Sequence, residues 1–89
     1  MKIWAVTKKN NKIQKDKIFE AQSGLDTLIF MACEDFDMGK PLMLKKNRHE
    51  LEEFRRTVFY AADFIESIAF DTFEVEIIDE DKEKQKNRM

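Results

Sequence analysis

The sequence predicts an α+β fold, a two-layer sandwich in which a mixed sheet of about four strands carries two helices on one face. Stretches rich in β-branched and aromatic residues alternate with capped helical stripes, in the order ββαβαβ. Eight Phe, one Trp and one Tyr supply aromatic area for the core of a short chain. The 89 residues contain no repeat and no internal linker. We therefore expect one domain over residues 1–79 and a charged, disordered tail over residues 80–89.

The first two predicted strands form a hairpin. Residues 3–7 and 12–21 are the strands, and the turn between them contains Asn10 and Asn11. Asparagine tolerates positive φ, which a tight hairpin turn requires. The alternation of apolar residues in the second strand is imperfect, so the pattern leaves the register open.

A helix is predicted to follow the hairpin. Ser23 is expected to cap its start, with Asp26 three residues later in a capping-box position. We expect the helix to end at Gly39, with Pro41 preventing its continuation. Its apolar face consists of Leu25, Leu28, Ile29, Ala32 and Phe36.

A third strand is predicted over residues 41–46, directly before a second helix. Asn47 is expected to be the N-cap of that helix and Glu50 its capping-box partner. The helical spacing predicts one helix over residues 48–68, although the β-prone residues 57–60 favour a break or kink there. The stripe is Leu51, Phe54, Val58, Ala61, Ile65 and Ile68.

The last predicted strand covers residues 72–79, where Phe73, Val75 and Ile77 alternate with Glu74 and Glu76. If the strands on either side of each helix pair in parallel, right-handed crossovers place both helices on the same face of the sheet.

The N-terminal hairpin is the most basic segment. Residues 1–17 carry six lysines against one aspartate. Lysines beside an aromatic ring can bind single-stranded nucleic acid by charge and stacking. Lysines on an edge strand also prevent sheet aggregation, and these can complement the acidic residues of the last strand. The residues proposed to contact nucleic acid are Trp4, Lys8, Lys9, Lys12 and Lys15.

A second cluster of basic residues lies between residues 45 and 56. Three glutamates interleave with it, no glycine-rich turn lets a phosphate approach the backbone, and we interpret it as solvated. His49 and Glu53 have helical i, i+4 spacing, but two ligands do not make a metal site. We expect no metal and no cofactor. The basic residues concerned are Lys45, Lys46, Arg48, His49, Arg55 and Arg56.

Glu34, Asp35 and Asp37 fall near the end of the first predicted helix, where carboxylates oppose the helix dipole. They are either plain solvated acids, an acid/base pair, a weak cation site or a patch that faces a partner. Cys33 has acidic neighbours that raise a thiol pKa, and we interpret it as a small core residue.

The skeleton PLMLKKN, then Glu50, Phe54, Arg56, Thr57 and Phe59, then DFIE and FDTFEVEII, resembles a small family of uncharacterised bacterial proteins from low-GC Gram-positive organisms. The resemblance covers about the last half of the chain. It implies no activity, substrate or cofactor. It implies that one structural motif contains Asn47, Arg56, Thr57, Phe64 and Glu66, and a turn after Phe59 in that motif would contradict the single long helix.

The expected function is protein interaction or regulation without catalysis, because no nucleophile–base pair, metal set or carboxylate pair is recognisable. The partner is expected to be an unidentified protein or a second copy bound through a strand edge or the second helix. Binding of single-stranded nucleic acid through the hairpin is the alternative. The single cysteine favours a cytosolic location, and the four-residue apolar run after Lys2 is too short to enter a membrane.

Overall fold

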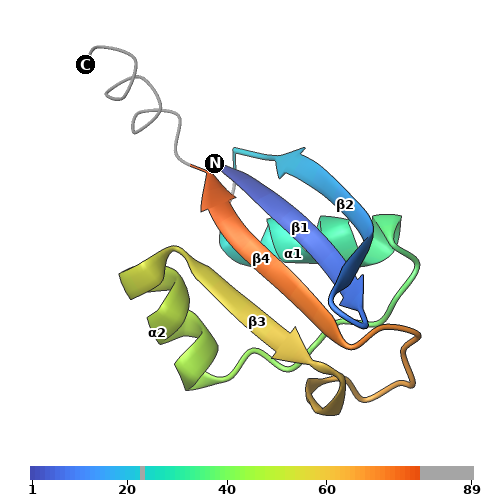
Figure 1. Cartoon of the computed structure of the whole chain (residues 1–89). Coiled ribbons are helices and arrows are strands. Elements are labelled where there is room, and N and C mark those ends of the chain that lie inside the picture. Colours follow the sequence, from blue (N-terminus) through green and yellow to red (C-terminus); the bar gives the residue numbers. More distant parts are fainter. Residues whose placement is uncertain (23, 79–89) are drawn as a thin grey trace.

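The chain combines a four-stranded sheet with two α-helices, and the computed structural model describes residues 1–22 and 24–78 (Figure 1). The predicted α+β class is confirmed. The capping role expected of Ser23 and the tail expected at residues 80–89 lie outside the described residues. In chain order the elements are β1 (Lys2–Lys9), β2 (Lys12–Glu20), α1 (Leu25–Asp35), α2 (Lys45–Phe54), β3 (Arg56–Tyr60), the short 3₁₀ helix η1 (Ala61–Asp63) and β4 (Thr72–Ile78).

The sheet has the strand order β2-β1-β4-β3, and every neighbouring pair is antiparallel. The predicted mixed sheet and the order ββαβαβ are therefore wrong, since the observed order is ββααββ. The difference comes from residues 41–46. Pro41 makes one isolated bridge with Phe64, and α2 already begins at Lys45.

The β1–β2 hairpin is confirmed, with Lys9 opposite Lys12 across its turn. Asn10 and Asn11 have φ angles of 54° and 65°, the two positive values that a two-residue hairpin turn of this hand requires. The backbone N–H of Asn10 also donates to Asp71 Oδ2 at 2.8 Å, which ties the turn to the loop before β4.

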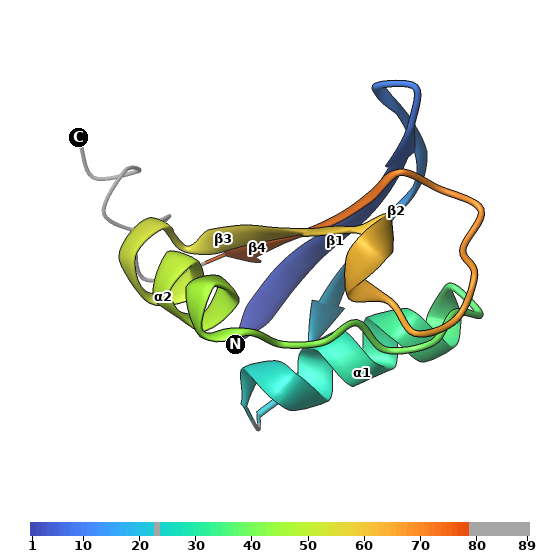
Figure 2. The ribbon, with the colours of Figure 1, turned by 90° about the horizontal axis from the view of Figure 1, so that it is seen from below.

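One face of the sheet carries the core, and α1 packs on that face beneath β1 and β2 (Figure 2). Alternate residues of β1, β3 and β4 point into it, as the antiparallel register requires. Phe73 is the centre of an aromatic cluster, with ring centroids 5.9 Å from Phe59 and 6.4 Å from both Phe36 and Phe64. Offset and edge-to-face rings of this kind add to the free energy gained from burial.

α1 ends at Asp35, four residues before the predicted end at Gly39. Asp37 takes the left-handed conformation, with φ 56°, that glycine was expected to supply. The N–H of Met38 donates to Cys33 O and the N–H of Asp37 donates to Glu34 O, the two bonds of a Schellman motif. An aspartate accommodates the required backbone here because its short side chain tolerates positive φ.

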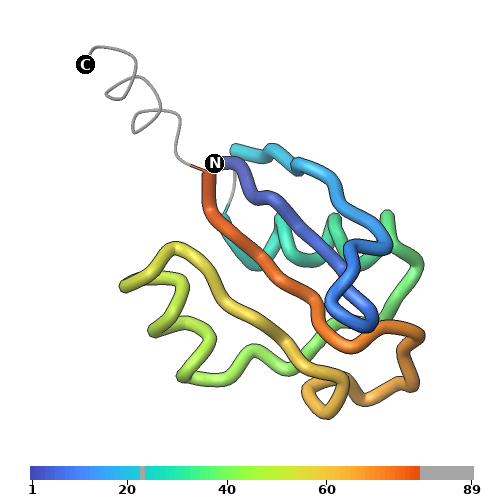
Figure 3. The backbone as a smooth tube through the Cα atoms, viewed as in Figure 1, coloured from blue at the N-terminus to red at the C-terminus, as the bar shows by residue number. Residues whose placement is uncertain are grey.

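The single helix predicted over residues 48–68 is wrong. α2 ends at Phe54, Arg55 adopts a left-handed φ of 63°, and the chain turns straight into β3 (Figure 3). The β-branched and aromatic residues 57–60 gain a full ladder with β4, which a helix would not give them. Leu51 of α2 joins the same core as α1.

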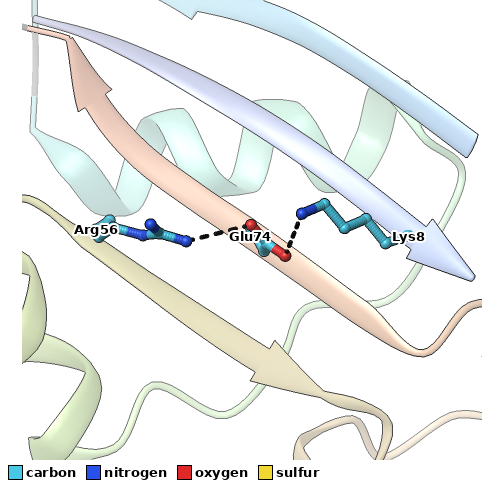
Figure 4. A network of polar contacts seen from close by, with 3 residues as sticks. All are labelled: Lys8, Arg56 and Glu74. Atoms are coloured by element: carbon cyan, nitrogen blue, oxygen red, sulfur yellow. Dashed lines mark hydrogen bonds and ion pairs between the residues drawn. The ribbon is translucent and has the colours of Figure 1, made fainter. Parts of the chain in front are cut away.

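Among the described residues, no helix packs on the other face of the sheet. Glu74 lies there between Lys8 at 3.1 Å and Arg56 at 3.4 Å (Figure 4). On the same face Trp4 Nε1 donates to Asp16 Oδ2 at 3.0 Å. Val6 lies between Asp16 and Glu74 in the register and is 2% exposed, so side chains of the neighbouring strands bury it.

The hairpin turn gives a first prediction. Asn11→Val should lower the free energy of unfolding by about 1–2 kcal/mol, because a β-branched residue is strained at positive φ. In a domain of this size the melting temperature should fall by about 4–8 °C for each kcal/mol. Asn11→Gly is the matched control and should retain or raise the melting temperature. Equal melting temperatures for the two variants would contradict the observed turn.

Candidate interaction groove beside the edge strand

A buried polar network joins α2 to β3. Asn47 Nδ2 donates to Thr57 Oγ1 at 2.9 Å, and the Thr57 hydroxyl donates to Glu50 Oε1 at 2.6 Å. Asn47 is fully buried and Thr57 is 2% exposed, so each depends on the other for its hydrogen bonds. The position of α2 along β3 is therefore set by hydrogen bonds between the two elements and not by the helix sequence alone.

The predicted cap is wrong in its geometry. Leu44 is the N-cap of α2, and Asn47 occupies the third helical position, where its Oδ1 accepts from the N–H of Leu44 at 3.1 Å. The Asn47 side chain therefore caps the helix from its third position, by accepting a hydrogen bond from the backbone of the N-cap residue. Glu50 takes no part in the cap and contacts Thr57 instead.

A groove of about 390 Å³ runs between α2 and β3. Helical positions four residues apart fall on one face, and three such residues of α2 form one wall. β3 forms the other wall. The lining residues are Lys46, Glu50 and Phe54 from α2, and Arg56, Thr57, Val58 and Tyr60 from β3. Phe54 and Tyr60 are 67% and 53% exposed, so the groove has accessible aromatic surface.

Backbone N–H and C=O groups of β3 point toward this groove. The N–H of Ile77 donates to Arg55 O at 2.8 Å, and the pairs Thr57–Val75 and Phe59–Phe73 are in phase with that bond. In an antiparallel ladder the residues between such pairs turn their N–H and C=O groups away from the partner strand. Arg56 and Val58 therefore point theirs outward. Tyr60 is closed off, because its N–H donates to Asp63 Oδ2 at 2.8 Å.

The two edges of the sheet differ in their protection. β2 carries Lys12, Lys15 and Lys17, and its pairing with β1 shifts register between Thr7 and Lys8. Lysines and bulges are the usual devices that prevent an edge from pairing with another chain. β3 has no lysine, no proline and no register shift. Of the two edges of the described sheet, β2 therefore carries these devices in its own sequence and β3 does not.

The predicted nucleic-acid residues do not form one surface. Lys8 pairs with Glu74 on the bare face, whereas Lys15 Nζ lies on the helix side, 3.5 Å from Phe36 O. Trp4 is engaged by Asp16. Only Lys9 and Lys12 remain together, opposite each other at the exposed hairpin tip.

The three acidic residues predicted to face a partner have different structural surroundings. Asp35 pairs with Lys17 at 3.3 Å, Asp37 forms the turn after α1, and Glu34 is exposed. Asp37 and Lys15 both line a second hollow of about 340 Å³ below the hairpin. The acids therefore serve local structure more than a common patch.

The basic residues between positions 45 and 56 are likewise dispersed. Lys46 lies 5.9 Å from the centroid of the Tyr60 ring, and Arg48 pairs with Asp26 at 3.3 Å. Arg56 pairs with Glu74 on the bare face. Over the described residues no group of three or more His, Cys, Asp or Glu side chains could hold a metal ion.

Sequence reasoning missed the groove because it placed α2 and β3 in one helix. The available signal was the β-prone run at residues 57–60, which favoured a break without indicating a strand.

No protein-family model, curated protein or solved structure matches the chain. The resemblance to a bacterial family stays a prediction. None of the described helices is both long and apolar enough to cross a membrane.

Replacing Thr57 tests the polar network. Thr57→Val keeps the shape but removes the hydroxyl, which leaves the buried Asn47 amide without its acceptor. The free energy of unfolding should fall by about 1–3 kcal/mol, measured by urea denaturation. Thr57→Ser keeps the hydroxyl and should cost clearly less. A serine variant as unstable as the valine variant would show that packing, not hydrogen bonding, dominates at this position.

Cys33 gives a prediction about reactivity. Burial raises the pKa of its thiol from 9.0 to about 11, with Lys40 opposing the shift. At pH 8 the thiolate should be about 100-fold scarcer in the folded protein than in the unfolded chain. Iodoacetamide should therefore alkylate the native protein at least that much more slowly than the urea-unfolded protein. Equal rates in the two states would place the thiol in a solvated environment.

Proposed function

We propose that the chain is a small, non-catalytic protein-interaction module that takes an extended segment of a partner protein as a fifth strand beside β3. The observation that carries the proposal is the unprotected edge of β3, whose outward backbone groups at Arg56 and Val58 face a groove. Strand addition of this kind obtains its affinity from main-chain hydrogen bonds and its selectivity from alternate side chains.

The position of α2 supports a lone strand as the occupant. An added strand would lie beside β3 with every second side chain directed toward the α2 wall, where Glu50 and Phe54 line the groove. In a homodimer that paired β3 with β3, the α2 helices of both copies would have to fit beside the paired strands. A short peptide brings no helix, so we favour it over the homodimer. The buried Cys33 supports a cytosolic location for such a module.

Backbone pairing at Val58 is the decisive test. Heptapeptides are selected from a random displayed library on the immobilised protein, and the affinity of the best one is measured by calorimetry. Val58→Pro removes the outward N–H without removing a bond to β4, and should weaken binding at least about tenfold. Val58→Thr retains the amide and should bind nearly as well. Thermal melting establishes that both variants are folded.

If the selected peptides bind Val58→Pro as tightly as they bind the parent protein, strand addition at β3 is excluded. Methylating the peptide's backbone nitrogens gives an independent measurement, because it removes donors from the ligand while the protein is unchanged. Methylated peptides with undiminished affinity would exclude the proposal in the same way.

Nucleic-acid binding through the hairpin is the second candidate, supported only by the exposed pair Lys9 and Lys12. Phosphate contacts make affinity fall steeply with salt. If a labelled single-stranded oligonucleotide binds at low salt and Lys9→Glu with Lys12→Glu abolishes it, this candidate replaces the first.

A further inference from the structure

We infer that the groove beside β3 selects an acidic, apolar-centred segment of the type Glu-x-apolar-x-Glu; this rests on the proposed function and adds the chemistry of the partner. The inference depends on where the charged groups of the groove lie along β3.

The groove has a cation at each end. Arg56 is the first residue of β3. Lys46 lies at the other end, with its Nζ 5.9 Å from the centroid of the Tyr60 ring. Tyr60 lies four positions after Arg56 along the strand, which corresponds to about 13 Å. Arg56 and Tyr60 are two alternations apart in β3, so partner residues opposite them share one side of the added strand. Carboxylates four residues apart would therefore lie beside Arg56 and beside the Tyr60 ring that Lys46 approaches.

The acidic residues that the structure describes near the groove offset these cations only in part. Of the described lining residues only Glu50 is acidic, and its Oε1 already accepts from the Thr57 hydroxyl at 2.6 Å. Glu74 pairs with Arg56 at 3.4 Å but lies closer to Lys8, at 3.1 Å, so the charge of Glu74 is shared between these two cations. Arg56 and Lys46 are both exposed and accessible to a carboxylate.

The middle of the groove is apolar on the bare-face side of an added strand. Val58 lies between Arg56 and Tyr60 on the bare-face side, and an apolar residue of the partner would pack against it. On the helix side Glu50 lies at the middle of the wall, and Phe54, whose ring is 67% exposed, lies at the Arg56 end. The peptide Glu-Val-Leu-Val-Glu places leucine opposite Val58 and valines toward α2, and its symmetry serves either strand direction.

The test compares three blocked peptides by fluorescence anisotropy: Glu-Val-Leu-Val-Glu, and the same peptide with both glutamates replaced by lysine or by glutamine. We expect the acidic peptide to bind about tenfold more tightly than the lysine peptide, with the glutamine peptide between them. The preference should shrink in 0.5 M NaCl, since the pairs are exposed (about 4–5 Å Debye length at that ionic strength).

Charge reversal in the protein should reverse the preference. Lys46→Glu with Arg56→Glu should favour the lysine peptide, and Lys46→Glu alone should remove about half of the original preference on a logarithmic scale. Lys9→Glu with Lys12→Glu changes the net charge equally at the hairpin tip and should leave the order of affinities unchanged. A reversal by this control would mean that net charge, not the groove, sets the preference.

The outcomes separate this inference from the proposed function. Equal binding of all three peptides, lost in Val58→Pro, would overturn the acidic selectivity while strand addition stands. No binding of the acidic peptide, alongside library peptides that require the Val58 amide, would do the same. A dimer in light scattering that Val58→Pro converts to a monomer would identify a second copy as the occupant and overturn the peptide.

Discussion

The hydrogen bond between Asn47 and Thr57 joins α2 to β3, the two elements that form the walls of the groove. The helix has ten residues, too few for stability in isolation, and only Asn47 and Leu51 of it are buried. Leu51 supplies apolar contact with the core, but a single side chain does not fix the rotation of a helix. The polar network does so, because a buried amide and hydroxyl find their partners in one arrangement only. The position of α2 beneath β3 thus determines which α2 residues form the groove wall opposite β3.

The same constraint explains the difference between the two edges of the sheet. β2 lies far from α2 and is protected by its own lysines and by a register shift. β3 lacks such devices and is shielded on one side by the helix that Asn47 positions. The bare face carries the ion pairs of Glu74 with Lys8 and Arg56. Of the two edge strands, β3 is therefore the one whose outward backbone groups lack lysines or a register shift beside them.

Local chemistry made the hairpin and β4 predictable. Two asparagines fit a turn with two positive φ angles, and strict alternation from Phe73 to Ile77 indicates a strand with one buried face. The groove was not predictable, because the spacing from Leu51 to Ile68 matches a helix although its members lie in a helix, a strand and a loop. Pairing of β3 with β4 outweighs that periodicity. A pattern read over neighbouring residues cannot show this pairing, because β4 lies farther along the chain. Asn47 was recognised as structural, but its partner Thr57 lies ten residues away and its burial could not be inferred from a capping pattern.

Amide hydrogen exchange at Val58, followed by NMR, tests the central claim most directly. In the free protein the Val58 amide should exchange much faster than those of Thr57 and Phe59, which face β4. Saturation with the acidic peptide should slow exchange at Val58 by about tenfold or more and leave Thr57 and Phe59 nearly unchanged. A Val58 amide that is already as protected as its neighbours in the free protein, or one that the saturating peptide leaves unprotected, would contradict an open edge that accepts a strand.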